Sequence, residues 1–310
     1  MKSIRQWFDN GEAAYSAESV ESAEDGIDWL RVIPFLVLHL ACLAVFFVGI
    51  SAVAVLMAVA LYLIRMFAIT AFYHRYFAHK SFKTTRPVQF LFALIGASAT
   101  QRGPLWWAAH HRQHHRHADQ PADPHSPKQG FFWSHMGWFL SGKHYQADYK
   151  LIPDWQRFSE LRWLDRYDLA VPVLLALALF ILGVLLEKYF PGSGTSGWQM
   201  LVWGYFISTV VLLHATLLIN SMAHCLGKKR YQTADESRNN LFLALLTLGE
   251  GWHNNHHHYP ASARQGFYWW EVEISYYILK LMQKSGLIWD VRTVPLHKRE
   301  SKKILPEESV

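Results

Sequence analysis

Histidines gather in three short stretches of the chain. These read His74-Arg-Tyr-Phe-Ala-His79, His111-Arg-Gln-His114-His115 and His253-Asn-Asn-His256-His257. The last two share the spacing H-x-x-H-H, and on a helix residues three and four apart lie on one face. We therefore expect each triad to direct its three imidazoles at a common point. His74 and His79 are about 140° apart around an α-helix, which indicates ligands of different metals or a helix that ends between them.

This set of imidazoles predicts a site for two metal ions. Eight imidazoles are more than one ion can use, and nitrogen ligands suit iron, copper, zinc or nickel. The two cysteines, Cys42 and Cys225, are too few for a cysteine-rich site. His224 is a ninth candidate, and Asn220 lies one helical turn earlier on the same face, where it could hold a metal-bound water. Exposed or pH-sensing histidines are the alternative, which two copies of one triad and a flanking pair disfavour.

Long apolar segments must position these histidines. The chain has 310 residues, 51% hydrophobic and 17% charged, whereas soluble domains carry about 25% charged residues. Four segments are long enough, at about 1.5 Å per residue, to cross a hydrocarbon core of about 30 Å: residues 32–49, 52–73, 169–187 and 198–220. The predicted fold is an all-α membrane protein with four transmembrane helices in two hairpins. A helical cap, formed by residues 74–168 and 221–290, would carry the histidine-rich site.

Basic residues predict the orientation. Residues 74–168 hold 13 lysines and arginines and residues 222–310 hold 12, against one, Lys188, between the last two spans. The positive-inside rule therefore places the cap, the histidines and both termini in the cytoplasm. We expect a polar leader over residues 1–30, the membrane domain over 31–290 and a basic, polar tail over 291–310. No basic stripe interleaved with aromatics favours nucleic acid as a partner, despite a net charge of +6.

Two apolar segments, residues 88–99 and 241–248, are too short to span a membrane. They are expected to be interfacial helices or walls of the cap.

The histidine motifs resemble those of a known family. HRYFAH, HHRQHH and GEGWHNNHH, with NSMAH between the last two, are similar to the boxes of the integral-membrane fatty acid desaturases. The resemblance covers most of residues 30–290, and the nearest group is the delta-9 acyl-CoA and acyl-lipid branch, which includes the stearoyl-CoA desaturases. It implies two iron ions, O2 as co-substrate, and these ligands: His74, His79, His111, His114, His115, His224, His253, His256, His257 and, through water, Asn220.

Desaturation fits the chemistry of such a site. No side-chain base removes hydrogen from an unactivated methylene, so the reaction needs O2, electrons and a metal. Carboxylates must orient the imidazoles, and Glu250, Asp119 and Asp123 are near enough in sequence to do so. No fused cytochrome domain is evident. We therefore expect a separate electron donor: a ferredoxin, a rubredoxin or a b-type cytochrome with its reductase.

The expected substrate is a long acyl chain whose polar head stays outside the protein. Trp106 and Trp107 are expected to line its entry, and Arg102 and Lys143 to contact the head. Residues at α-helical spacing from His74 share its face, which predicts Leu63 and Ala60 at the floor of the tunnel.

The head group is where the sequence departs from the animal acyl-CoA enzymes. Ala109 and Gly142 stand where those enzymes carry basic residues, and Ser262-Ala263-Arg264 after the third box is similar to bacterial acyl-lipid members. Acyl-CoA is the expected substrate, with the acyl chain of a glycerolipid as the alternative.

Two other functions share part of this pattern. A histidine-box hydroxylase or alkane monooxygenase would use the same metals and O2. A metal transporter would place its ligands near the middle of the spans, where only His39 and His214 lie.

Overall fold

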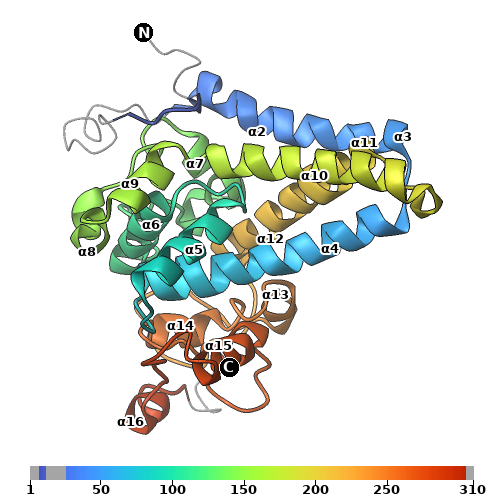
Figure 1. Cartoon of the computed structure of the whole chain (residues 1–310). Coiled ribbons are helices and arrows are strands. Elements are labelled where there is room, and N and C mark those ends of the chain that lie inside the picture. The colour runs from blue at the N-terminus through green and yellow to red at the C-terminus, as the bar shows by residue number, and fades with distance from the viewer. Residues whose placement is uncertain (1–6, 12–25, 305–310) are drawn as a thin grey trace.

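The computed structural model describes residues 7–11 and 26–304. Its described elements are helices, joined by loops that form only isolated β-bridges. Long apolar helices lie side by side at one end of the molecule, and shorter helices gather at the other end (Figure 1). The observed architecture is therefore all-α.

Three helices are long and apolar enough to cross a membrane: Ala52–Ala78, Ala170–Tyr189 and Gly197–Met222. The first consists of α4 (Ala52–Phe67) and the π-helical η4 (Ala68–Ala78). The second is α10 (Ala170–Tyr189). The third joins α11 (Gly197–Gln199), the π-helical η9 (Met200–Ile207) and α12 (Ser208–Met222). They occupy the segments predicted as the last three spans.

The segment predicted as the first span is a shorter apolar helix, Val32–Val48. It consists of α2 (Trp29–Ala41), a 3-10 turn η3 (Cys42–Ala44) and α3 (Val45–Val48). Pro34 lies inside α2 and lacks the N–H that a helix interior uses. Length and composition thus support membrane crossing for three of the four predicted spans, and α2 packs against η9 of the third long helix.

Local chemistry explains where the hairpins turn. Gly49 has φ +70°, a conformation that favours glycine, and the Ser51 side chain accepts a hydrogen bond from Ala54 N at the start of α4. In the second hairpin a Cβ on Gly183 would lie 2.5 Å from Ser196 O. Only glycine allows the two helices to approach this closely.

One charge is buried among the spans. Arg65 on α4 is 1% exposed and donates hydrogen bonds to Thr209 Oγ1 at 2.7 Å, to Ser98 O at 3.3 Å and to Ser208. Hydroxyl and carbonyl oxygens thus satisfy the guanidinium inside the bundle, as a membrane interior requires. These contacts hold α4 against α12.

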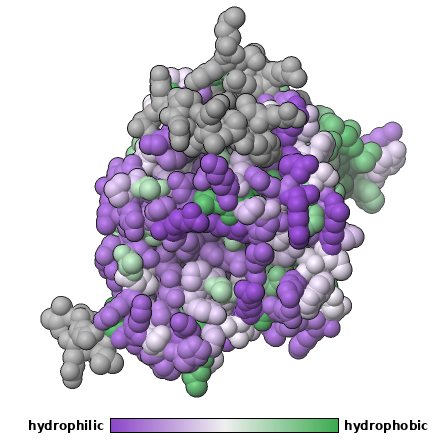
Figure 2. All heavy atoms as spheres, turned by 90° about the vertical axis from the view of Figure 1, so that its left-hand side faces the viewer, coloured by the Kyte–Doolittle hydropathy of each residue, from purple (hydrophilic) through white to green (hydrophobic). Residues whose placement is uncertain are grey.

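The cap is formed by short helices. Before the second hairpin it contains α5 (Arg86–Ala97), α6 (Pro104–His117), η5 (Pro127–Gln129), η6 (Trp133–Gly137), α7 (Trp138–Leu140), η7 (Tyr149–Leu151), α8 (Pro153–Gln156) and α9 (Ser159–Arg166). The hairpin turn holds η8 (Pro191–Ser193). After it come α13 (Leu241–Leu246), α14 (His253–His258), α15 (Ile274–Lys284) and α16 (Leu296–Glu300). The face turned away from the apolar helices is mainly hydrophilic (Figure 2).

Parts of the expected leader and tail contact α2 and the cap. Trp7 Nε1 donates to Leu30 O at 2.8 Å, and Asn10 Nδ2 donates to Asp165 O at 3.0 Å. In the tail, Lys298 O on α16 accepts a hydrogen bond from His258 at 2.7 Å. Residues 1–6, 12–25 and 305–310 of these two segments lie outside the described residues.

Candidate metal centre and substrate cavity

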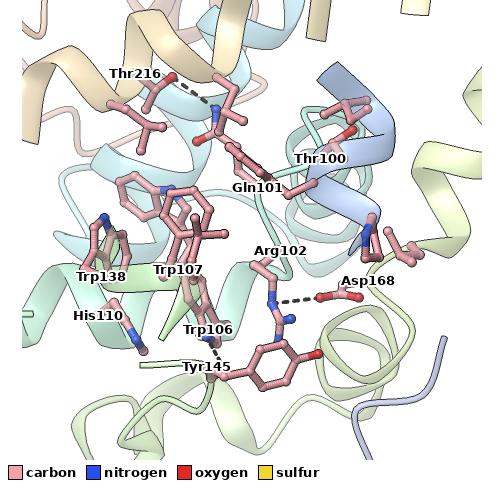
Figure 3. A pocket seen from close by; sticks show the side chains of 18 of the residues that line it. Thr100, Gln101, Arg102, Trp106, Trp107, His110, Trp138, Tyr145, Asp168 and Thr216 are labelled. Carbon is pink, nitrogen blue, oxygen red and sulfur yellow. Dashed lines mark hydrogen bonds and ion pairs between the residues drawn. The ribbon is translucent and has the colours of Figure 1, made fainter. Parts of the chain in front are cut away.

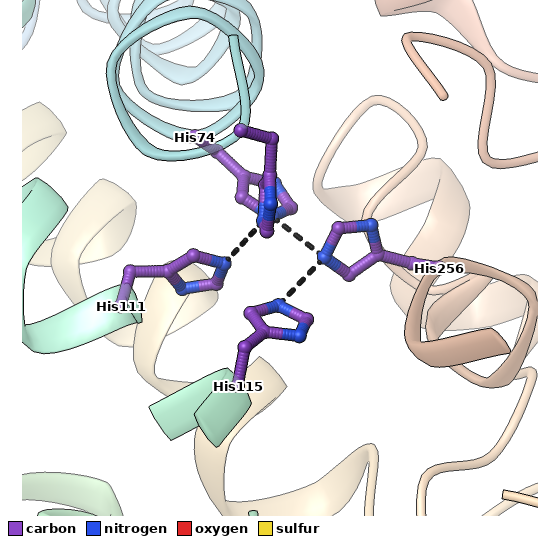
Figure 4. A group of neighbouring side chains, drawn as sticks. His74, His111, His115 and His256 are labelled. Atoms are coloured by element: carbon purple, nitrogen blue, oxygen red, sulfur yellow. Dashed lines mark hydrogen bonds between the residues drawn. The ribbon is translucent and has the colours of Figure 1, made fainter. Parts of the chain in front are cut away.

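Five of the predicted ligands form a first cluster: His74, His79, His111, His115 and His256. Their ligating nitrogens all lie within 4.8 Å of one another. The Nε2 atoms of His74 and His256 are 3.0 Å apart, those of His79 and His111 2.8 Å, and those of His115 and His256 2.9 Å. The labelled rings of His74, His111, His115 and His256 come from three separate elements, η4, α6 and α14, and point toward one another (Figure 4). His79 directly follows η4.

The remaining four histidines form a second cluster: His114, His224, His253 and His257. The Nε2 atoms of His224 and His253 are 3.0 Å apart, and those of His114 and His257 are 3.4 Å apart. All nine histidines singled out from the sequence thus fall into two adjacent groups. The neighbouring His110, His117 and His258 belong to neither group.

The expectation that each triad meets at one point is wrong. His111 and His115 belong to the first cluster and His114 to the second, whereas His253 and His257 belong to the second and His256 to the first. On an α-helix the first and last histidines of H-x-x-H-H are four residues apart and differ by only about 40° around the axis. The fourth position is adjacent to the last and differs from it by about 100°. Each helix therefore serves both clusters.

His74 and His79 lie in the same cluster because the helix between them is π-helical. A π-helix closes hydrogen bonds between residues five apart, and His79 N donates to His74 O at 3.2 Å. Residues five apart therefore return to one side, and the helix ends at Ala78. The sequence left two alternatives for His74 and His79: they bind different metals, or the helix ends between them. This geometry disfavours the first.

Carboxylates hold the outer nitrogens of four of these rings. Nδ1 of His224 lies 3.0 Å from Asp119, Nδ1 of His114 3.0 Å from Asp123, and Nδ1 of His257 2.9 Å from Asp235, while Glu250 contacts Nδ1 of His74. A carboxylate accepts the hydrogen of Nδ1, which leaves the lone pair of Nε2 directed into the cluster. The residues present therefore fit metal ions.

Sequence reasoning named three of these carboxylates and missed Asp235. It also missed Gln265, whose Nε2 lies 3.3 Å from Nδ1 of His74 and donates to Glu250 at 3.0 Å. Asp235 lies in a loop, where it accepts from Ser237 N at 3.0 Å. Neither residue belongs to a motif, so no local signal marks them.

Burial and charge set the protonation of the site. Burial lowers the pKa of His79, His111, His115 and His256 well below 6.5, which keeps these rings neutral and able to bind metal. Burial alone would raise the pKa of Glu250, but contact with Arg75 and His74 lowers it to about 2. The second cluster is similar: His257 lowers the pKa of Asp235 below its usual range against the effect of burial.

Three further histidines join α2, α12 and η6 away from the clusters. His39 Nδ1 donates to Phe35 O at 2.7 Å, so its Nε2 accepts from Nε2 of His214 at 3.0 Å. Nδ1 of His214 then accepts from Nε2 of His135 at 2.9 Å, and Nδ1 of His135 lies 3.0 Å from Ser221 Oγ. Among the described residues, these three hydrogen-bonded histidines do not form one of the groups that could hold a metal ion. This disfavours a metal transporter.

A cavity of about 450 Å³ lies beside the clusters. Its walls include Phe35 and Leu38 of α2 and Leu213 of α12, and it reaches His111 and Asn220. Most of the lining is apolar. The cavity therefore connects a hydrocarbon-like space with the metal-binding side chains.

Three of the residues predicted for the substrate line this cavity: Trp106, Trp107 and Arg102. Trp107 stacks on His111 with ring centroids 5.0 Å apart. Arg102 Nε lies 3.0 Å from Asp168 Oδ2, and the guanidinium lies over Tyr145 (Figure 3). Its charge is therefore balanced within the protein. Lys143 does not line the cavity.

The prediction of Leu63 and Ala60 as the tunnel floor is wrong. Both are exposed on α4, Leu63 by 45%, and neither lines the cavity. The prediction counted α-helical turns upward from His74, but residues 68–78 are π-helical and advance by fewer degrees per residue. The face of His74 is therefore not the face of Leu63.

Sequence reasoning also missed several cavity residues. Trp7 and Phe8 of the leader line it. Gln101, in the loop between α5 and α6, and Thr216 of α12 line it as well. Gln101 Nε2 donates to Thr216 Oγ1 at 3.1 Å (Figure 3). Nothing in their local spacing marks them.

Fold and site together define a membrane-embedded protein in which apolar helices hold two buried clusters of histidines beside an apolar cavity. A fatty acid desaturase family model matches residues 29–289, and the chain belongs to this family. It is an oxidoreductase, a desaturase, as its relatives are.

Three relatives illustrate the range of named substrates. The chain is 37% identical over 273 residues to an sn-2 palmitoyl-lipid 9-desaturase of Nostoc sp. (strain 36), covering 86% of this chain and 91% of the relative. It is 36% identical to an sn-1 stearoyl-lipid 9-desaturase of Anabaena variabilis, over 87% and 96% of the two chains. It is 38% identical to an acyl-CoA 5-desaturase of Anemone leveillei, over 76% and 70%.

Proposed function

We propose that the protein inserts a cis double bond at the delta-9 position of a long acyl chain carried by a membrane glycerolipid. The observation that carries this proposal is the apolar cavity, which reaches His111 and Asn220. Two hydrogen atoms leave adjacent methylenes, and O2 is reduced to two waters with two electrons and two protons from a donor. The methylenes would lie in this mainly apolar cavity, beside the clusters.

A lipid substrate replaces the acyl-CoA expected from the sequence. The two cyanobacterial relatives are named for lipid-bound acyl chains, and the plant relative for acyl-CoA. In the cavity Arg102 pairs with Asp168, and Lys143 lies elsewhere. The lining therefore offers little surplus positive charge for the phosphates of coenzyme A, whereas a glycerolipid keeps its head at the membrane surface.

Two iron ions are the proposed cofactor. Bound in the two clusters, they would supply the activation of O2. The nine histidines would hold them, with Asn220 contributing through water, and Asp119, Asp123, Asp235 and Glu250 would orient the rings. Trp107 would separate the acyl chain from the ring of His111, on which it stacks.

The proposed topology keeps four crossings, with the helix Val32–Val48 as the first. Its 17 residues span about 26 Å, and its exposed side chains include Leu40 (63%), Phe46 (81%) and Phe47 (89%). With the basic segments inside, both termini and the clusters face the cytoplasm. The electron donor, a ferredoxin, a rubredoxin or a b-type cytochrome, is then a separate cytoplasmic protein.

The test is product analysis in cells that lack their own desaturase. We expect monounsaturated acyl chains to appear first in the glycerolipids, with the double bond located by mass spectrometry. A His256→Ala variant, which removes a ligand of the first cluster, should insert normally and give no product. Products that gain an oxygen atom would indicate a hydroxylase. Products that appear first in acyl-CoA would indicate that acyl-CoA, rather than a glycerolipid, is the substrate.

A further inference from the structure

The short helix α13 exposes an apolar side although it belongs to the cap. Asn240 begins it by accepting a hydrogen bond from Leu243 N at 3.1 Å. Leu243 is buried, whereas Leu241, Phe242 and Leu245 are 54%, 67% and 50% exposed. A helix in water would not be expected to expose three large apolar side chains together.

A contact with α4 gives the depth of this helix. Tyr62 Oη donates to Leu246 O, the last carbonyl of α13, at 2.6 Å. Tyr62 lies ten residues after Ala52, about 15 Å along the axis of α4, whereas the hydrocarbon core is about 30 Å thick. Helical side chains lean toward the N-terminus of their helix, so the side chain of Tyr62 leans away from the cap. Any tilt of α4 further shortens the distance, measured across the membrane, between Ala52 and Tyr62.

The surroundings of Tyr62 are apolar. Its neighbours Leu63 and Ile64 are 45% and 53% exposed on α4, within a helix that is apolar enough to span a membrane. In hydrocarbon every carbonyl at a helix end needs a donor from the protein, and Tyr62 supplies one to Leu246. In Figure 1, α13 lies beside the middle of α4 rather than with α16.

The exposed apolar surface continues onto α15. Ser275 N donates to Leu248 O at 3.0 Å, and Ser275 Oγ lies 2.6 Å from Thr70 Oγ1 of η4, so α15 begins beside the end of a span. Its exposed residues have helical spacing on one face. We call the whole surface the α13–α15 face: Leu241, Phe242, Leu245, Trp270, Val272, Ile274, Tyr277 and Leu281, each at least 39% exposed.

We propose that the α13–α15 face is embedded in the bilayer leaflet on the side of the histidine clusters, with α13 inside the hydrocarbon. The occupant of this face is the acyl region of membrane lipids. The surface is continuous with the lipid-facing side of α4 through Tyr62 and Leu246, and none of its residues is charged. The cap is therefore anchored within the leaflet as well as by the spans.

This anchor is joined closely to the metal-binding residues. Asn240 N donates to Gly251 O at 2.8 Å, and a Cβ on Gly251 would lie 2.1 Å from Ala244 N, so the loop after α13 packs directly on the helix. That loop carries Glu250, the partner of His74, and leads into His253. The depth of α13 thus fixes the height of the third histidine stretch above the bilayer. If the proposed function holds, this height helps to select the carbon that is desaturated.

The test measures depth with spin labels. Cys42 and Cys225 are replaced by serine, and single cysteines are introduced at Phe242 or Leu245 in the protein reconstituted in phosphatidylcholine vesicles. Leu296 on α16, which is 65% exposed, is the matched control. We expect labels at 242 and 245 to collide mainly with O2, as in hydrocarbon, and the label at 296 to collide mainly with a water-soluble nickel complex.

Two outcomes would overturn the proposal. Access of nickel to position 242 equal to that at 296 would place the face in water, and protection from both reagents would indicate cover by protein, such as a second copy. A Phe242→Lys variant gives a second readout: it should lower the desaturation rate roughly tenfold or more, whereas Leu296→Lys should not. An unchanged rate for Phe242→Lys would also count against the proposal. Because the depth measurement needs no activity, failure of the proposed function would leave it interpretable.

Discussion

Replacing Asp235 by asparagine should weaken the second cluster more than removing its side chain. Asp235 Oδ2 accepts from Nδ1 of His257 at 2.9 Å, and Oδ1 accepts from Ser237 N at 3.0 Å. The carboxylate therefore holds the ring hydrogen on Nδ1 and directs the lone pair of Nε2 toward His114. Asparagine keeps the bond to Ser237 but presents its own N–H to Nδ1. This favours the tautomer with hydrogen on Nε2, which cannot bind metal.

The expected magnitude follows from the burial of this contact. Asp235 is 8% exposed, and its pKa lies below the usual range because His257 outweighs the effect of burial. Loss of such an orienting partner lowers metal affinity or activity about 10–100-fold. We expect Asp235→Ala to fall in this range, because metal can still select the correct tautomer of His257. Asp235→Asn should reach the upper end of the range, because its amide opposes that tautomer.

The assay is iron content per chain after dialysis against a graded series of chelator concentrations, together with the desaturation rate. Glu236→Gln is the matched control, since Glu236 is the neighbouring residue, is exposed and pairs with Lys229. It should retain both irons and full activity. The reasoning is refuted if Asp235→Asn binds the second iron as tightly as the unaltered protein, or if alanine is the more damaging substitution.

Three further predictions concern the cavity, the histidine chain and pH. Leu213→Trp fills part of the cavity wall, and because one methylene in a pocket is worth about 1–3 kcal/mol, it should shift products toward shorter acyl chains; an unchanged profile at normal activity would contradict this. His214→Leu leaves Nε2 of the buried His135 without its hydrogen-bond partner, which costs about 1–3 kcal/mol, so the melting temperature in detergent should fall while iron content stays the same. Burial lowers the pKa of His257 to about 4, against about 6.5 unfolded. The unfolded chain then binds more protons between these values, so the metal-free protein should be fully stable above pH 6.5 and lose stability as pH falls toward 4; denaturant titrations that show no such loss would contradict it.

The incorrect prediction of the tunnel floor has its cause in the pitch of one helix. Residues 52–79 are mainly apolar and contain no proline or glycine, and this pattern predicts a helix but not its pitch. The pitch changes at Ala68, where η4 begins. Packing of this segment against α5 and α6, with Phe72 stacked on Phe92 at 3.8 Å, is decided by residues far along the chain. Helical counting from His74 therefore cannot find the cavity.

The sequence by itself determined the identity of the nine histidines and the three long apolar helices. Both are local properties: histidines that recur within a few positions can be read directly from the sequence, and an uninterrupted apolar segment needs no partner to be read as a span. Tertiary structure alone decided how the histidines divide into two clusters, because His256 meets His74 and His115 from other helices. It also decided that Asp235 holds His257 and that α2 and α12 wall the cavity. These contacts join residues more than twenty positions apart, and their partners are set by the packing of whole helices rather than by spacing along the chain.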